Sequence, residues 1–174
     1  MCIRDRPGRA FENSYYTFDI LSDYGSFRDL QRHRLMTIEW QKMNPELGFN
    51  FPDEVKKTPY ENECKELITK SKELYEKLEA SFPHLKEYSL LFGHNIRYSI
   101  TMNVRQAFHL IELRTAKQGH ISYRKVCMKM HDQIKDIAGH SNFYELMNFT
   151  DHEEYELQRL DSEVKQAKKK ENFN

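Results

Sequence analysis

The sequence has few cysteines, no long apolar run and no excess of charge of either sign. Cys2, Cys64 and Cys127 are far apart and form no C-x-x-C pair, which argues against a disulfide or zinc framework. No apolar stretch approaches the roughly 20 residues that a membrane span needs. Lys plus Arg and Asp plus Glu each number 27, so no overall charge attracts nucleic acid. We therefore expect a cytoplasmic protein that binds neither membrane nor nucleic acid.

The chain has 174 residues, enough for one domain with a buried core. Its start, "MCIRDRPGRA", lacks the apolar region of a signal peptide, and we interpret residues 1–9 as a non-native leader on an N-terminally truncated protein. The domain is predicted over residues 10–150, followed by a charged tail over 151–174. We expect residues 1–9 and those beyond about 165 to be poorly ordered, because neither segment has an apolar period to bury.

Apolar periodicity predicts an α+β fold dominated by helices, with a small antiparallel sheet. The longest helix is predicted from Asn62 to Phe82, where apolar residues recur at steps of three and four. Strands are predicted over 14–22 and 95–103, the second with Ile96, Tyr98, Ile100 and Met102 on one face. Further helices are predicted over 26–44, with Ser26 as the candidate N-cap, and over 85–92, 104–117 and 122–138.

Three histidines stand eleven residues apart, at His109, His120 and His131. Gly119 is expected to break the helix between the first two, and no carboxylate completes a ligand set. We therefore favour structural or surface histidines over a metal site. Cys64 lies on an amphipathic face and is expected to be core, whereas Cys127 could be either core or reactive.

Two cationic segments remain, "RHR" at 32–34 and "NVRQAFHLIELR" at 103–114. Such segments are often solvated surface. They can also form the wall of an anion site, because guanidinium groups match phosphate and imide oxygens. Arg105 and His109 share one helical face at a spacing of four. Two separated cationic patches beside apolar runs would suit a ligand that is both anionic and aromatic.

These segments resemble conserved blocks of the flavin-dependent thymidylate synthases. "FENSYYTFDI" resembles the family's Leu-Glu-His-x-Ser-Phe-Thr-Phe-Glu-Ile strand, and "RHR" opens its signature R-H-R-x-x-S-x-N-E-x-S-x-R-Y. "NVRQAFHLIELR" resembles N-A-R-E-L-R-H-F-F-E-L-R. The three blocks occur in the same order over residues 11–140. The resemblance implies methylation of dUMP with FAD, a reduced nicotinamide cofactor such as NADPH and methylene-folate, in a tetramer with FAD between subunits.

The resemblance also implies roles for individual residues. Those matching positions that contact FAD are Arg32, His33, Arg34, Asn103, Arg105 and His109. Arg114 matches the arginine that holds and polarises the dUMP base, which makes it the catalytic candidate. Thr37 takes the place of a serine that binds substrate.

Several family positions differ in this chain. After "RHR" the signature's Asn-Glu, Ser and Arg-Tyr are replaced by Glu39-Trp40, Lys42 and Asn44-Pro45. A further family arginine falls near Lys86-Glu87. A lysine does not reproduce the bidentate fork of an arginine. The positions that contact FAD are therefore partly kept, whereas most positions that bind dUMP carry other residues.

Three interpretations follow from this pattern. The chain can be a flavin-dependent thymidylate synthase, or the diverged half of a duplicated synthase that completes a site with a partner domain. It can instead be a non-catalytic scaffold of the same fold. A helical nucleic-acid-binding module using "RHR" and the basic tail is disfavoured by the neutral net charge.

Overall fold

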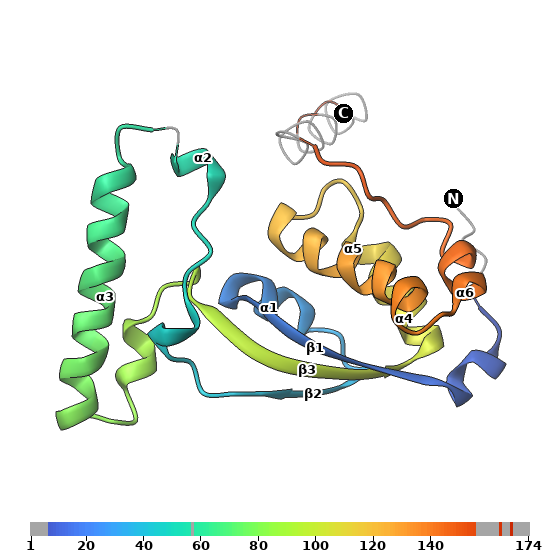
Figure 1. The fold of residues 1–174 in the computed structure, drawn as a ribbon, viewed down its shortest axis with the longest axis horizontal. Coiled ribbons are helices and arrows are strands. Elements are labelled where there is room, and N and C mark those ends of the chain that lie inside the picture. Colours follow the sequence, from blue (N-terminus) through green and yellow to red (C-terminus); the bar gives the residue numbers. More distant parts are fainter. Residues whose placement is uncertain (1–6, 57, 156–163, 165–167, 169–174) are drawn as a thin grey trace. The chain divides into compact units, whose positions relative to one another are not determined.

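The computed structural model describes residues 7–56, 58–155, 164 and 168. Strands β1 (Tyr15–Asp23), β2 (Thr37–Trp40) and β3 (Asn95–Asn103) form a sheet in the order β1-β3-β2 (Figure 1). The helices are α1 (Tyr24–Leu30), α2 (Asp53–Lys56), α3 (Glu61–Ser81), α4 (Val104–Arg114), α5 (Ile121–Asp136) and α6 (Ser141–Leu146). The described residues also form the short 3-10 helices η1 (Arg9–Asn13), η2 (Pro45–Leu47) and η3 (Lys86–Ser89). The predicted helix-dominated α+β fold with a small antiparallel sheet is confirmed.

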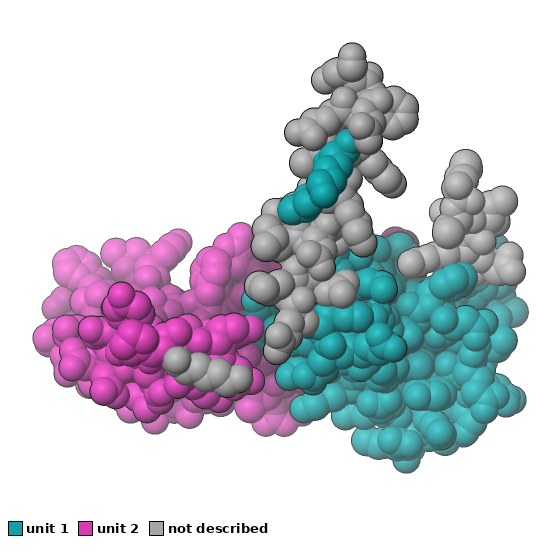
Figure 2. Space-filling view, turned by 90° about the horizontal axis from the view of Figure 1, so that it is seen from above, with its two compact units in different colours: residues 1–18, 101–174 teal, residues 19–100 magenta. Residues whose placement is uncertain are grey.

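The chain divides into two compact units (Figure 2). Unit 1 contains residues 1–18 and 101–174, and unit 2 contains residues 19–100. Within unit 1, α5 packs on α4 and α6, and η1 packs on α4. Within unit 2, η3 packs on α3.

Strand β3 confirms the prediction over 95–103. Ile96, Tyr98, Ile100 and Met102 are all at most 2% exposed, and the residues between them are more exposed. A strand turns alternate side chains to opposite faces, so period-two burial is the expected result. The strand predicted over 14–22 is likewise confirmed as β1.

Helix α3 confirms the long helix predicted from Asn62 to Phe82, and it ends before Pro83. Its apolar stripe is less buried than an amphipathic pattern indicates: Tyr75 is buried, whereas Leu67 and Leu74 remain about half exposed. Packing on α3 includes the hydrogen bond from the Ser71 hydroxyl to the Ser89 carbonyl, at 2.6 Å.

The helix predicted over 26–44 is wrong beyond Leu30. Helix α1 ends at Leu30, and a turn leads to β2, where Thr37, Ile38 and Trp40 are residues that favour strands. Its N-cap is Asp23 and not Ser26, because the Asp23 carboxylate accepts from the Ser26 N–H at 2.8 Å. The backbone N–H of Gln41 donates to the Arg97 carbonyl at 3.0 Å.

The C-terminal helices lie close to their predicted ranges. Helix α4 is three residues shorter than predicted over 104–117, and α5 ends before Gly139, whose φ of 72° stops the helix. The 85–92 helix is reduced to the 3-10 turn η3. The predictions of poor order fall largely outside the described residues, which begin at Pro7 and include only Lys168 beyond 165.

A buried histidine in unit 2 leads to a pH prediction. His94 is 1% exposed, its Nδ1 accepts from the Leu91 N–H at 3.0 Å, and its ring meets Phe49 edge-on at 5.0 Å. Burial lowers the pKa of His94, so the folded protein resists taking up a proton that the unfolded chain accepts. Stability should therefore fall as the pH drops below about 6.5, the ordinary histidine pKa.

The measurement is urea unfolding at pH 7 and pH 5 for the wild type and His94→Asn. Asparagine keeps an acceptor near the Leu91 N–H and does not titrate. The variant should lose less stability between the two pH values, whatever its offset at pH 7. An equal loss in both proteins would show that His94 does not contribute to the acid sensitivity.

Candidate functional site

The first predicted site segment, Arg32 to Arg34, follows α1 directly in unit 2. The helix is anchored by Phe27 and Leu30, which are 2% and 0% exposed, and Phe27 meets Tyr98 edge-on at 4.9 Å. At its other end the Asp23 carboxylate accepts hydrogen bonds from the Ser26 N–H and hydroxyl, both at 2.8 Å. The three cationic residues therefore directly follow a helix that is capped at its start and anchored by buried side chains.

The side chains of the segment lie at the surface. The Arg32 side chain is 67% exposed, forms an ion pair with Asp29 and donates from Nε to the Arg28 carbonyl at 3.3 Å. Arg34 is exposed, and His33 is half-buried with its N–H donating to the Leu30 carbonyl at 3.1 Å. Exposed guanidinium groups keep donors available to an anionic ligand.

The positions after the segment have structural roles. Thr37, the substrate candidate, is an exposed residue at the start of β2. Trp40 is 58% exposed and packs against Phe27 with ring centroids 5.6 Å apart. Asn44 caps η2, its side-chain oxygen accepting from the Glu46 N–H at 3.0 Å. Asn44, which replaces the arginine of the family signature, therefore has a structural role here.

The second predicted group belongs to α4, in unit 1. The Asn103 side chain accepts from the Gln106 N–H at 2.8 Å and so caps the helix. Arg105 donates from Nη1 to Glu12 Oε1 at 2.6 Å and from Nε to the Pro7 carbonyl at 3.1 Å. The hydrogen bond from Arg105 lowers the pKa of the Glu12 carboxyl. Glu12 belongs to the block "FENSYYTFDI" and Arg105 to the block "NVRQAFHLIELR". The ion pair therefore joins two motif blocks, through residues that are 93 positions apart.

The remaining α4 candidates differ in exposure. His109 is exposed, and Arg114 is half-buried with its guanidinium 5.4 Å from the centre of the Tyr123 ring. Cys127 is fully buried, and burial raises its pKa to about 12, so the thiol is core and unreactive. Arg32, His33 and Arg34 belong to one unit and the α4 group to the other. That both groups contact FAD, as the resemblance implies, stays a prediction.

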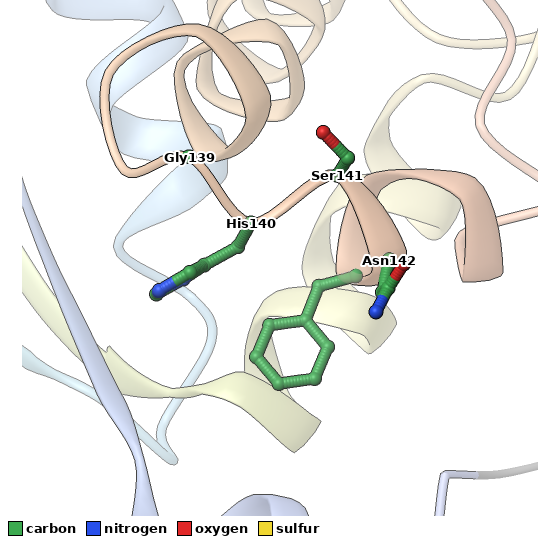
Figure 3. Close-up of a pocket in the computed structure, with 5 residues that line it drawn as sticks. Gly139, His140, Ser141 and Asn142 are labelled. Atoms are coloured by element: carbon green, nitrogen blue, oxygen red, sulfur yellow. The ribbon is translucent and has the colours of Figure 1, made fainter.

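A hollow at the start of α6 contains none of the predicted site residues. It is lined by Gly139, His140, Ser141, Asn142 and Phe143 (Figure 3). Burial raises the pKa of the Tyr16 phenol, which lies 2.6 Å from Nδ1 of His140. A phenol that keeps its proton can donate it to this nitrogen, which ties β1 to the lining of the hollow.

Sequence reasoning missed a buried arginine on α5. Arg124 is 1% exposed and donates to the carbonyls of Thr115, Glu153 and Asp151 at 2.8, 2.9 and 3.4 Å. Its guanidinium also lies 5.1 Å from the centre of the Tyr155 ring. Arg124 precedes Cys127 and Met128 by three and four residues, and that spacing on the buried face was the available signal.

The three evenly spaced histidines, His109, His120 and His131, do not form a cluster among the residues that the structure describes. His120 caps α5, accepting from the Ser122 N–H at 3.2 Å, and His109 is exposed on α4. His131 is 4% exposed, and its Nδ1 lies 2.8 Å from Nε2 of His152. The pairing of His131 with His152 spans 21 positions, and no motif in the sequence predicted it.

Comparison with known proteins identifies the family. The model of the thymidylate synthase complementing protein family matches residues 1–139. The chain belongs to this family.

Several similar proteins are UPF0159 proteins. It is 35% identical over 160 residues to a UPF0159 protein of Chlamydia muridarum, covering 92% of this chain and 30% of that protein. It is 30% identical over 164 residues to a UPF0159 protein of Thermoplasma acidophilum, with 93% and 32% covered. A flavin-dependent thymidylate synthase of Thermococcus onnurineus is 32% identical over 117 residues, with 60% and 47% covered. The chain thus spans about a third of the UPF0159 relatives' length.

A solved structure supports the fold. Thymidylate synthase X from Helicobacter pylori, crystallised with FAD and dUMP, matches with a TM-score of 0.59 and 16% identity. The match covers 80% of this chain and 75% of that chain. In the part of the chain that the structure describes, no helix is both long and apolar enough to cross a membrane.

Proposed function

We propose that the chain is a flavin-dependent thymidylate synthase-like domain that binds FAD through Arg32, His33 and Arg34. The observation that carries the proposal is the exposed cationic segment held at the end of the anchored helix α1, in a chain of this family. The solved Helicobacter pylori protein contains FAD and dUMP, which supports the same ligands here.

The donor chemistry of this segment fits the cofactor. FAD presents a pyrophosphate and polar ring oxygens, and guanidinium groups donate paired hydrogen bonds to both kinds of acceptor. A bound flavin supplies hydride-transfer chemistry between a reduced nicotinamide and the methylene-folate carbon. Arg32, Arg34 and His33 would hold the anionic parts of the cofactor and stabilise negative charge that develops on it. Arg105 and His109 are the further candidates on α4.

Arg114 is the proposed contact to dUMP. Its guanidinium is held over the Tyr123 ring, which limits the conformations of a flexible side chain. From that position a fixed cation could polarise a pyrimidine carbonyl, and Thr37 would contact substrate with its hydroxyl. The reaction supported by the family would be methylation of dUMP to dTMP in the cytoplasm.

The proposal includes an oligomer or a longer protein. The family resemblance implies a tetramer, and the UPF0159 relatives are more than three times as long as the matched segment. A second domain of the same family could then complete the site with the dUMP-binding residues that are replaced here. We therefore propose that full activity needs such a partner.

A non-catalytic scaffold is the second candidate, and specific contacts favour it. Asn103 is committed to capping α4, Arg105 to Glu12, and Asn44 to capping η2. Residues engaged in this way stabilise the fold without any ligand. The two candidates differ in whether the isolated chain binds FAD.

Calorimetric titration of FAD into the full chain tests the proposal. Arg32→Ala should weaken FAD binding by about 1.5–3 kcal/mol, the range for a lost hydrogen bond to a charged group. Lys77→Ala, on the exposed surface of α3, removes one charge elsewhere in unit 2 and should leave the affinity unchanged. dUMP titrated separately should bind weakly or not at all.

The same titration distinguishes the alternatives. No FAD binding by the chain, alone or with a synthase domain added, would leave the scaffold as the function. Equal affinities for Arg32→Ala and wild type would remove Arg32 from the site. Tight dUMP binding would show that the replaced residues are not needed for the substrate.

A further inference from the structure

Three potential metal ligands meet in unit 1. His131 and Asp132 are neighbours on α5, and His152 lies in the segment that follows α6. His131 Nδ1 is 2.8 Å from His152 Nε2, and that nitrogen is 3.9 Å from Asp132 Oδ1. One ligand atom from each residue lies within 4.8 Å of the other two. We propose that His131, Asp132 and His152 bind a divalent transition-metal ion of the zinc class.

The tautomer of His131 follows from its hydrogen bonds. Its Nε2 lies 3.0 Å from the Tyr144 carbonyl oxygen, which can only accept, so Nε2 carries the proton of the neutral ring. Nδ1 then has a lone pair, and it is this atom that faces His152. Metal-binding histidines commonly donate their second ring N–H to a backbone carbonyl, which aims the lone pair at the metal.

Packing holds the His131 ring in that orientation. The ring stacks on Tyr144 with centroids 4.0 Å apart and planes inclined by 14°, and the residue is 4% exposed. A ligand that is already oriented loses little freedom on binding an ion.

The spacing of the ligand atoms suits a tetrahedral ion. Bonds of about 2.0–2.1 Å to nitrogen and oxygen place neighbouring ligand atoms roughly 3.3 Å apart. The contacts of 2.8 and 3.9 Å lie on either side of that value. Shifts of about half an ångström by His152 and Asp132 would therefore admit the ion. Two imidazoles and one carboxylate are a ligand set typical of zinc, with a fourth position open to water.

The competing role is a hydrogen bond without metal. In that state the Nε2 proton of His152 is donated to His131, and the contact only fastens residues 147–155 to α5. Binding of an ion requires that proton to leave. A metal would link the same two segments more strongly, and it would do so independently of any flavin.

Zinc chloride titrated into the full chain, after removal of metals with EDTA, provides the test. One equivalent should bind with micromolar affinity or better, and raise the thermal midpoint of unfolding. His152→Ala should weaken binding at least tenfold. His84→Ala removes an exposed histidine in unit 2 and should bind zinc like the wild type. Cobalt(II) should bind with the visible absorption of a tetrahedral site.

A second variant, Asp132→Asn, separates a loss of zinc binding from a folding defect. Asp132 is half-exposed, and asparagine preserves its size while weakening its power as a ligand. A reduced affinity in both variants, with helix content unchanged by circular dichroism, would support the site. Wild type that binds no zinc, or variants that bind as tightly as His84→Ala, would overturn it and leave the hydrogen-bonded histidine pair.

Discussion

Replacing Arg124 by methionine is expected to lower the free energy of unfolding by about 3–5 kcal/mol. Methionine fills much of the same volume but donates no hydrogen bond. The Thr115 and Glu153 carbonyls, now bonded to Arg124 at 2.8 and 2.9 Å, would lose a donor in a site where Arg124 is 1% exposed. The carboxylate of Asp151, 3.6 Å from the guanidinium, would lose its nearby cation.

The effect should extend beyond the substituted residue. Asp151 donates from its N–H to the Thr115 hydroxyl at 3.1 Å, and that hydroxyl donates to the Ile111 carbonyl at 2.8 Å. Arg124 therefore belongs to a polar network that joins α4, α5 and the segment around Asp151. Removing one member of a buried network leaves several groups without good partners.

Urea unfolding followed by circular dichroism measures the loss. Lys125→Met is the matched control, because Lys125 is the next residue and its ion pair with Glu154 is exposed on both sides. That control should change stability by less than about 1 kcal/mol. A similar small loss in Arg124→Met would mean that water replaces the guanidinium without penalty.

Asp23→Ala is expected to lower the free energy of unfolding by about 2–3 kcal/mol, because it removes a helix cap and an interior hydrogen bond. Asp23 is 8% exposed. Its carboxylate accepts from the Ser26 N–H, the Ser26 hydroxyl and, at 3.2 Å, the Asn50 side chain. Alanine would remove the carboxylate that accepts these three hydrogen bonds.

Asp23→Asn provides the comparison for this prediction. Asparagine is also a good N-cap residue, so it should recover at least half of the loss. Both variants can be followed by urea unfolding, with FAD titration as a second measurement. A loss below 0.5 kcal/mol for Asp23→Ala, on the scale of surface substitutions, would show that the cap is dispensable.

Local pattern explains which elements were predictable. Strand β3 has alternating apolar residues and α3 has an apolar period near 3.6, and each period specifies its element without knowledge of the neighbours. The failure over 26–44 has the opposite cause. The residues around Thr37 to Trp40 fit either an amphipathic helix or a strand, and only the tertiary fold, which includes the sheet order β1-β3-β2, decides between them.

The candidate site was predictable in part. The motif blocks in the sequence supplied the family, which the match over residues 1–139 confirms, and the site residues that the blocks imply. Spacing could not reveal that Arg105 pairs with Glu12 across 93 positions, or that His131 meets His152. Contacts between distant positions depend on how the helices pack, and that packing leaves no local period.

The fold class, the long helix α3, the strands β1 and β3, and the family are all predictable from the residues alone. These properties depend on side-chain periodicity and on the order of residues, and both are visible in the sequence. In contrast, tertiary packing is responsible for the end of α1 at Leu30, the burial of Arg124 and the contact between His131 and His152. A buried charge is stable only where distant backbone carbonyls converge on it, and that convergence exists only after the chain has folded.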